Sequence, residues 1–367
     1  MGKHLVLAGG GHAHLVTLAN MKQIVREGHR VTVIGPSPYH YYSGMGPGML
    51  GGTYLPEEIR FSTKQQVEKN GGVFLQDRIQ RVIPDKRQVE LEKGAAVSYD
   101  VISFNIGSDV SQDIVTRNNG DIYTVKPIEK LAEAKNRIHE ILSEKQAVID
   151  IIGGGPASAE IAGNIRQIGQ HQGGHIPKIR IFSSREFMPR FSERVRLLVR
   201  NSLMKRGIEF HENSSVQKVE TGKIVLSSGE VYEPDLIFLA TGVKPSPIFQ
   251  QSGLPVGPDG GLLVNRYLQS KAYPEIFGGG DCIFFEEAYL DKVGVYAVRE
   301  NPVLYHNLFA ALSGRPLKSF EPGGDYLLIF NMGGGTGVLQ KKWFTLHGKI
   351  AFILKDYIDR KFMKRFQ

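Results

Sequence analysis

Residues 4–14 read HLVLAGGGHAH, and this stretch decides how the N-terminal part of the chain folds. A short apolar run, Leu5–Ala8, is followed by three glycines and then by a helix-like segment, residues 13–26. An apolar strand, a glycine-rich turn and a helix form the pattern that seats a dinucleotide pyrophosphate at a helix N-terminus. Gly9 permits the tight turn, and Gly11 lets the backbone approach the phosphates closely.

The first motif departs from the G-x-G-x-x-G pattern in two places. The third glycine position holds His14, and no acidic residue ends the next expected strand, residues 31–34, because Gly35 and Pro36 follow it. Taken alone, the stretch fits an ordinary glycine-rich connection between a strand and a helix equally well.

A second strand–glycine–helix unit resolves this ambiguity. Residues 148–152 (VIDII) form an apolar strand, residues 153–155 are again three glycines, and a helix is expected from there to about residue 170. Two such units predict two nucleotide-binding domains in one chain, with the two turns facing a shared cleft.

Composition limits the class of protein. The length of 367 residues predicts two or three domains, and the formal charge of +8 favours anionic ligands. No nucleic-acid motif is present, so we expect no nucleic-acid partner. The single cysteine excludes an internal disulfide, a Cys-x-x-Cys pair and a cysteine zinc site, and we predict no metal site. No apolar run reaches the roughly 18–20 residues of a spanning helix, so we expect a cytoplasmic protein that either is free or rests on the inner face of a membrane.

The remaining elements follow from periodicity and turn residues. Helices are expected over residues 128–143, 192–205 and 296–312, and the tail from residue 326 is expected to begin as β structure and end as a basic, aromatic helix. Residues 109–123 are polar and are expected to form a loop. Residues 35–49 are expected to form a long structured loop or the broken start of a helix. Strands are expected at residues 74–82, 89–91, 101–106, 179–182, 208–210, 216–220, 224–226, 236–239 and 276–277.

Two later motifs extend the pattern to most of the chain. Ala240-Thr241-Gly242 follows an apolar strand, and Gly280-Asp281 follows the sequence EIFGG. Together with the two glycine turns, they resemble the FAD-dependent pyridine nucleotide-disulfide oxidoreductase superfamily, which is glutathione-reductase-like. The resemblance implies an α/β fold with two Rossmann-like domains. The FAD-binding domain would comprise residues 1–122 and 245–325, the inserted NAD(P)H-binding domain residues 123–244, and a C-terminal segment residues 326–367.

The cysteine count separates the branches of this superfamily. The segment Tyr42–Met45, where disulfide reductases of the superfamily carry thiols, has none. The chain therefore resembles type II NADH dehydrogenases, and its closest likeness is to the NADH-dehydrogenase-like domain found alone or fused to selenide, water dikinase. The residues that carry this likeness are YYSGMGPGMLGG (41–52), FNIGS (104–108), VKPIEKL (125–131), GVYAVRENPVLYHNL (294–308) and LKDYIDRKFMKRF (354–366).

The resemblance implies a function and its alternatives. Hydride would pass from NADH or NADPH to FAD, and electrons would pass on to a quinone-like acceptor without redox cysteines. A reductase of another carrier, such as a small iron–sulfur protein or a selenium species, and a slow flavin-binding regulatory module are the alternatives. Cys282 would be structural.

The same resemblance assigns residues to the site. Asp281 would hydrogen-bond the FAD ribitol, Glu160 would lie near the nicotinamide, and Lys126 could place a cation near the flavin. A first-turn helix glutamate and a surface lysine are the plain structural interpretations of the last two. On the FAD side the predicted binding residues are Gly9, Gly11, His12, Ala13, Pro36, Ile79, Asn105, Gly107, Gly280, Asp281, Tyr296 and Ala297. On the NAD(P)H side they are Gly153, Gly155, Pro156, Ala157, Ser158, Ser184, Arg185 and Gly242.

Two further predictions follow from charge. The second strand of the second unit ends in Ser183-Ser184-Arg185, where NAD enzymes of this type place a carboxylate on the ribose 2′-hydroxyl, so we predict a preference for NADPH or dual use. The C-terminal helix carries aromatic and basic residues. It could lie on an anionic bilayer, cap the flavin domain or form the seam of a homodimer.

Overall fold

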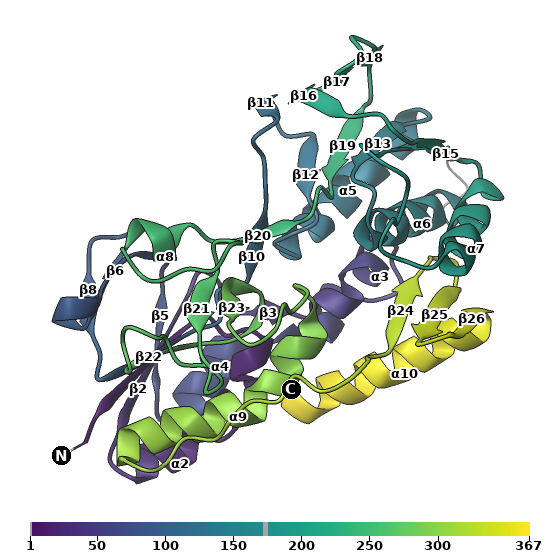
Figure 1. Ribbon diagram of the computed structural model, residues 1–367. Helices are drawn as coiled ribbons and strands as arrows, with labels where there is room; N and C mark the ends of the chain where they lie inside the picture. Colours follow the sequence, from purple (N-terminus) through teal and green to yellow (C-terminus); the bar gives the residue numbers. More distant parts are fainter. Residues whose placement is uncertain (1, 172–174) are drawn as a thin grey trace.

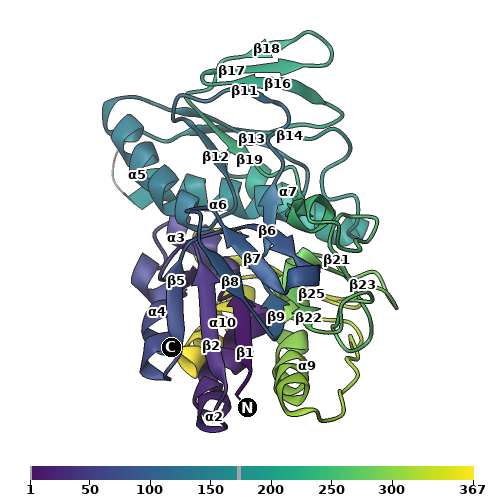
Figure 2. The same cartoon turned by 90° about the vertical axis from the view of Figure 1, so that its left-hand side faces the viewer.

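Two five-stranded parallel sheets form the frame of the protein, whose computed structural model describes residues 2–171 and 175–367. Figure 2 shows the two sheets one above the other. The first has the order β22-β9-β1-β2-β5 and the second the order β12-β19-β13-β14-β15. The first consists of β1 (His4–Ala8), β2 (Arg30–Gly35), β5 (Val73–Gln76), β9 (Val101–Phe104) and β22 (Ile276–Gly278). The second consists of β12 (Ile122–Thr124), β13 (Val148–Ile152), β14 (Lys178–Phe182), β15 (Ile208–His211) and β19 (Leu236–Leu239).

The central strand of each sheet is an unbroken apolar run because both of its faces are covered. Leu5, Val6 and Leu7 of β1 are fully buried, as are Ile149 and Ile151 of β13. β1 lies between β2 and β9, and β13 lies between β14 and β19, so the strand order reverses direction at each central strand. Open α/β sheets bind ligands beyond the carboxyl ends of their strands at such a switch point, and this is where both glycine turns lie.

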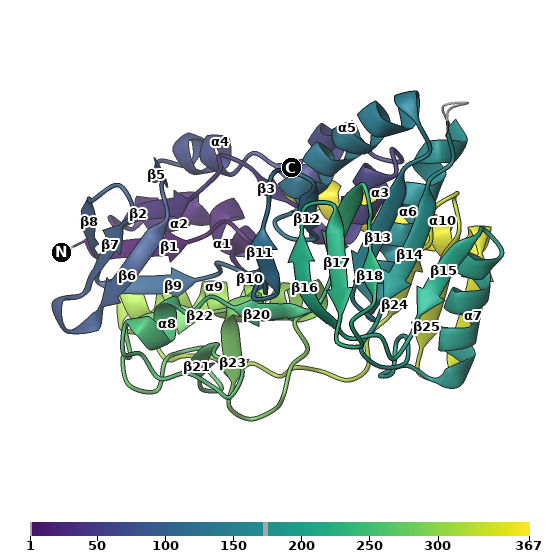
Figure 3. The same cartoon turned by 90° about the horizontal axis from the view of Figure 1, so that it is seen from above.

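Smaller sheets attach to this frame. β10 (Ser108–Val110) pairs with β20 (Val243–Pro245) where the chain crosses between the two units, and Figure 3 shows this pair between them. The four-stranded sheet contains β11 (Val115–Arg117), β16 (Val216–Glu220), β17 (Lys223–Leu226) and β18 (Val231–Tyr232). The others are β6 (Ile79–Ile83) with β7 (Gln88–Leu91) and β8 (Ala96–Ser98), β3 (His40–Tyr41) with β4 (Arg60–Phe61), and β21 (Leu262–Val264) with β23 (Ile283–Phe285).

The long helices lie where the periodicity predicts them, whereas the short helices Thr63–Lys69 and Ile248–Gln251 were not expected, and the N-terminal helix differs. The expected helix over residues 13–26 is broken at Asn20, whose backbone leaves the helical region at φ −105° and ψ 11° and whose side-chain amide donates to the Val16 carbonyl at 2.8 Å. The helices are α1 (Leu15–Ala19), α2 (Met21–Arg26), α3 (Gly46–Leu50), α4 (Thr63–Lys69), α5 (Glu129–Glu144), α6 (Pro156–His171), α7 (Glu193–Met204), α8 (Ile248–Gln251), α9 (Gly294–Ser313) and α10 (Lys349–Phe366).

The expectation of a loop over residues 109–123 was wrong. This segment contributes to β10, β11 and β12, each only three residues long. Val115 of β11 pairs with Val219 of β16, and Ile122 of β12 pairs with Ile237 of β19. A strand is recognised in a sequence by apolar and polar residues that alternate over at least four positions, and three residues are too few to show this pattern. These strands are held instead by backbone hydrogen bonds to partners far away in the sequence.

The C-terminal segment forms an antiparallel sheet and a helix. The sheet contains β24 (Leu328–Asn331), β25 (Gly337–Lys341) and β26 (Phe344–Gly348), and α10 packs against it. Figure 1 shows this unit in yellow, below α3, α6 and α7. No helix in the described part of the chain is long and apolar enough to cross a bilayer.

Candidate functional site

The two glycine turns have the same construction. Gly9 has a φ of +90°, and a Cβ there would lie 2.3 Å from the carbonyl oxygen of Asn105. Gly153 has a φ of +142°, and a Cβ there would lie 2.1 Å from the carbonyl oxygen of Ala240. In each unit the strand on one side of the central strand ends against the turn, so only glycine fits at these positions.

Both turns line one cavity of about 2210 Å³, as the paired motifs predict. Most of the predicted site residues line it as well. They are Gly9, Gly11, His12, Pro36, Ile79, Asn105, Gly107, Lys126, Gly153, Gly155, Pro156, Ala157, Glu160, Ser184, Arg185, Gly242, Gly280, Asp281, Tyr296 and Ala297.

Two of the predicted binding residues, Ala13 and Ser158, differ from the rest in their burial. Both are fully buried and neither is among the residues that line the cavity. The Ala13 methyl lies against Gly279, where an added Cβ would come within 2.8 Å of it, and the Ala13 N–H donates to Asn105 Oδ1 at 3.1 Å. Ala13 therefore packs between the first glycine turn and the Gly-Asp turn.

The first turn contains two histidines with different surroundings. His14, at the third glycine position, is fully buried and lies with its Nδ1 2.7 Å from the Gly9 carbonyl and its Nε2 2.8 Å from Ser103 Oγ, so it ties the turn to β9. His12 lines the cavity, and its buried Nε2 has no partner among the described residues. A buried polar atom of this kind needs a hydrogen-bond partner, so the turn fits a polar ligand such as a dinucleotide.

Lys126, the predicted cation, and Asp281, the aspartate predicted to bind the FAD ribitol, form an ion pair. Lys126 Nζ lies 2.6 Å from Asp281 Oδ2 and 3.1 Å from Ser108 Oγ, and the Ser108 hydroxyl donates to the same carboxylate at 2.8 Å. Burial acts to raise the pKa of Asp281, but the Lys126 charge and the two hydrogen bonds outweigh it and lower that pKa. The carboxylate is therefore ionised and held in place on the cavity wall.

Two buried polar residues brace the Gly-Asp turn. Glu300 of α9 accepts the Gly280 N–H, and burial raises the pKa of Glu300 to about 7. Asn105 donates to the Gly279 carbonyl at 2.7 Å. Because Asn105 also accepts from Ala13, it joins the first glycine turn to the Gly-Asp turn. Sequence reasoning did not identify Glu300, because it stands between Arg299 and Asn301, and such a short polar run does not distinguish a buried carboxylate from an exposed one.

In the second unit, β14 is followed by a polar segment, residues 183–186, without a free carboxylate. Ser183 Oγ donates to the Arg185 carbonyl at 2.7 Å, which fixes the turn that follows β14. Ser184 and Arg185 are exposed and line the cavity. The next acid along the chain, Glu186, forms an ion pair with Arg196.

Glu160 lies at the wall shared by α6 and the C-terminal sheet. Its Oε1 accepts the Asn331 N–H of β24 at 2.7 Å. Burial raises the pKa of Glu160 to about 7, and the nearby Lys355 charge opposes this shift. The carboxyl group therefore titrates close to neutral pH, as a group that exchanges protons must.

A buried polar cluster at the α10 side of the cavity was missed by sequence reasoning. Tyr42 donates its hydroxyl to Asp359 Oδ1 at 2.9 Å, and Lys355 Nζ donates to Asp359 Oδ2 and to the Gly44 carbonyl, both at 2.7 Å. Burial and the adjacent Asp359 raise the pKa of Tyr42 well above its ordinary value. The signal was present, because Lys355 and Asp359 are four residues apart and in phase with the buried Ala351 and Met363.

Cys282, the single cysteine, has the surroundings of a packing residue. It is fully buried beside Asp281, its Sγ lies 3.4 Å from the carbonyl oxygens of Phe104 and Gly279, and burial raises the pKa of its thiol to about 12. In the part of the chain that the structure describes, no three histidine, cysteine, aspartate or glutamate side chains are grouped as metal ligands.

Known proteins share this architecture. The chain is 27% identical to ferroptosis suppressor protein 1 of Taeniopygia guttata, over 78% of this chain and 76% of that protein. It is 23% identical to the type II NADH:quinone oxidoreductase of Haemophilus influenzae, over 95% of this chain and 90% of that protein. The solved structure of NDH2 from Plasmodium falciparum in complex with NADH matches its fold with a TM-score of 0.79 at 16% identity, over 99% of this chain and 98% of that one.

The family assignment follows from the sequence profile. Residues 3–307 match the pyridine nucleotide-disulphide oxidoreductase family, and this match contains both glycine turns, the crossing strands and the Gly-Asp turn. The cavity that the two turns share, with its unpaired His12 nitrogen, agrees with a pair of dinucleotides. The chain therefore belongs to the pyridine nucleotide-disulphide oxidoreductase family and is an FAD-dependent NAD(P)H oxidoreductase.

Proposed function

We propose that this protein is an NAD(P)H dehydrogenase that passes electrons through FAD to a quinone-like acceptor. The observation that carries the proposal is that one cavity joins both glycine turns to the buried cluster of Tyr42, Lys355 and Asp359. The cavity therefore has room for a donor, a cofactor and an acceptor. The Haemophilus influenzae relative is a type II NADH:quinone oxidoreductase.

We assign the first glycine turn to FAD and the second to NAD(P)H. The FAD domain would comprise residues 1–122 and 245–325, and the NAD(P)H domain residues 123–244. In support, all strands of the first sheet come from the first set of residues, and all of the second sheet except Ile122, the first residue of β12, comes from the second. Asp281, held by Lys126 and Ser108, would bind the ribitol, and Arg185 would face the adenosine ribose.

The acceptor would bind where α10 meets the cavity. Bound FAD supplies a two-electron relay, so the overall reaction is NAD(P)H plus one proton plus quinone, giving NAD(P)⁺ and quinol. Lys355 uses two of its three N–H donors on Asp359 and Gly44 and keeps one for a quinone oxygen, whereas the single hydroxyl hydrogen of Tyr42 would have to turn from Asp359 to the quinone. Glu160, whose pKa lies near 7, would exchange the proton that the reaction takes from water.

Separate measurement of the two half-reactions tests this function. We expect purified protein with FAD to be bleached rapidly by anaerobic NADPH or NADH in a stopped-flow instrument, and to be reoxidised by menadione or a short-chain ubiquinone within the same time range. Rapid bleaching followed by stalled reoxidation with every quinone would contradict the acceptor assignment. The absence of bleaching would contradict the dehydrogenase function.

Cofactor choice follows from the end of β14. We propose that NADPH is preferred or used together with NADH. Enzymes that select NADH place a carboxylate here, which would repel a 2′-phosphate, whereas this chain has Ser184 and Arg185 on the cavity wall. The next carboxylate, Glu186, forms an ion pair with Arg196. The change R185A should lower kcat/KM for NADPH at least about tenfold, since a charge-assisted contact is lost, and leave NADH little affected. Arg194, an exposed residue of α7 that is not part of the cavity lining, provides the matched control R194A.

We also propose that α10 and β26 rest on an anionic bilayer. Trp343, Ile350, Ile353 and Tyr357 are 85%, 66%, 64% and 62% exposed, and Lys349, Lys361, Lys364 and Arg365 lie exposed around them. An apolar face with a basic border is suited to lipid headgroups and acyl chains. Ile358, which is partly exposed on the same helix, also lines the cavity, so a lipid-dissolved quinone would have a short route to Lys355. The alternative to a bilayer is a second copy of the chain, which would bind this face in a homodimer.

A further inference from the structure

Two histidines contact each other at the cavity wall: His12, which is predicted above to bind FAD, and His40, to which no role has been assigned. His12 belongs to the first glycine turn, and His40 begins β3. His40 Nε2 lies 3.1 Å from His12 Nδ1, and the two rings are nearly perpendicular, with centroids 4.9 Å apart. Both residues line the cavity. We refer to them below as the His12–His40 pair.

The contact couples the tautomers of the two rings. Burial lowers the pKa of His12 to about 4 and lowers that of His40 well below its ordinary value. The charged groups that act on them do not reverse this, since the Lys126 charge lowers the pKa of both while Asp281 raises only that of His12. Both rings are therefore neutral at pH 7, and only one hydrogen can lie between the two facing nitrogens.

The outer nitrogen of His12 is the unsatisfied end of this arrangement. His12 Nε2 is buried and has no partner among the described residues. Two aromatic rings lie against the His12 ring. The Phe362 ring is nearly parallel to it, at an interplanar angle of 15° and with centroids 5.8 Å apart, and the centroid of the Tyr42 ring lies 5.2 Å away. A buried nitrogen without a partner, in a residue that lines the cavity, indicates a contact that a bound group completes.

We propose that the His12–His40 pair is a hydrogen-bond chain to bound FAD, in which His40 donates to His12 and His12 donates to an acceptor oxygen of the cofactor. This rests on the assignment of FAD to the first turn. Phosphate oxygens only accept hydrogen bonds, so the cofactor selects the tautomer of His12 with hydrogen on Nε2. The Nδ1 of His12 then becomes an acceptor, and His40 is the residue placed to satisfy it. His40 is thus a positioning residue that acts on the cofactor through His12.

Substitutions at the pair separate hydrogen bonding from packing. The change H12F removes the contact to FAD and keeps a ring, so we expect flavin fluorescence titration to show FAD affinity about tenfold lower. The change H40Q preserves an amide N–H that can donate to His12 and should bind FAD as the unchanged protein does. The change H40F preserves a ring without a donor and should weaken FAD binding severalfold. Phe61 stacks on His40 without a polar atom, so F61L measures the effect of packing alone.

Two results would overturn the proposal. One is FAD affinity in H12F or H40F equal to that of the unchanged protein. The other is a loss in H40Q as large as that in H40F, because this would make the pair a packing contact.

A measurement on the unchanged protein decides the matter even if the variants misfold. Nitrogen-15 NMR of histidine-labelled protein with FAD bound should show His12 with its hydrogen on Nε2, and a hydrogen on Nδ1 would contradict the chain. If the protein binds no FAD at all, the proposed function fails. If it binds FAD but His12 carries the other tautomer, only the role of the pair fails.

Discussion

Glu160 changes its charge close to neutral pH. Its pKa is raised by burial from 4.5 to about 7, so between these values the folded protein holds a proton that the unfolded chain has lost. The free energy of unfolding must therefore fall as pH rises from about 4.5 to 7, by up to about 3 kcal/mol from this residue. The Asn331 N–H that Glu160 accepts would be retained by a glutamine oxygen.

The change E160Q should therefore stabilise the protein at pH 8 and leave it nearly unchanged at pH 5. Urea unfolding of both proteins at the two pH values measures this. Glu300, whose pKa is also raised to about 7, is present in both proteins and cancels from the difference. A constant difference between pH 5 and pH 8 would show that Glu160 is ionised throughout, and it would remove the basis for a proton-exchanging role.

At the scale of elements, α10 has two faces with different partners. Its buried face carries Ala351, Lys355, Asp359 and Met363. Its exposed face carries Ile353, which contacts no core cluster and is 64% exposed. A substitution on the exposed face should therefore leave the fold intact and change only the binding of α10 to a membrane or to another protein.

The change I353E should reduce co-sedimentation with vesicles that contain anionic lipid, because a buried carboxylate in the headgroup region is costly. The matched control is V231E, since Val231 is 50% exposed on β18, in the sheet distant from α10 in Figure 1. Unchanged vesicle binding of I353E, together with a change in mass by light scattering, would instead assign this face to a second copy of the chain.

The elements that sequence predicts are those whose signal is local. β1, β13 and the two glycine turns are visible because a buried central strand and its turn are contiguous. β10 and β11 were missed because their partners, β20 and β16, lie more than 100 residues away.

The same reasoning applies to the residues of the candidate site. Asp281 and Glu160 lie in motifs, whereas Tyr42 and Lys355 meet only because α10 folds back on residues 42–44, a contact no short stretch encodes.

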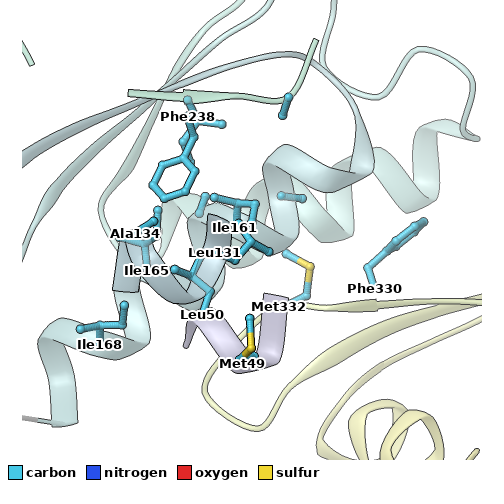
Figure 4. Close-up of a cluster of buried hydrophobic side chains, with 14 of the residues drawn as sticks. Met49, Leu50, Leu131, Ala134, Ile161, Ile165, Ile168, Phe238, Phe330 and Met332 are labelled. Carbon is cyan, nitrogen blue, oxygen red and sulfur yellow. The ribbon is translucent and has the colours of Figure 1, made fainter. Parts of the chain in front are cut away.

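At the scale of the whole molecule, the C-terminal segment joins the two units. Figure 4 shows one side-chain cluster that contains Met49 and Leu50 of α3, Ile161 and Ile165 of α6, and Met332 beyond β24. The first pair belongs to the proposed FAD domain, the second to the proposed NAD(P)H domain and the last to the C-terminal segment. Polar contacts repeat the pattern, since Tyr54 donates to Asp356 at 2.9 Å. The cavity between the units is therefore braced from its α10 side.

The closest backbone approach in this brace is between α6 and the residue after β24. A Cβ added to Gly163 would lie 2.1 Å from the Met332 carbonyl oxygen. The change G163A would gain up to about 1 kcal/mol of helix propensity, but the forced backbone shift costs about 1–3 kcal/mol, so a net loss of stability is expected. Because Asn331 precedes Met332 and donates to Glu160, the shift should also expose residues 326–367 to limited proteolysis. G324A is the control, since a Cβ there meets no atom within 4 Å. If G163A resists protease as well as G324A does, the C-terminal segment is held by α10 alone, and the two units are not braced through α6.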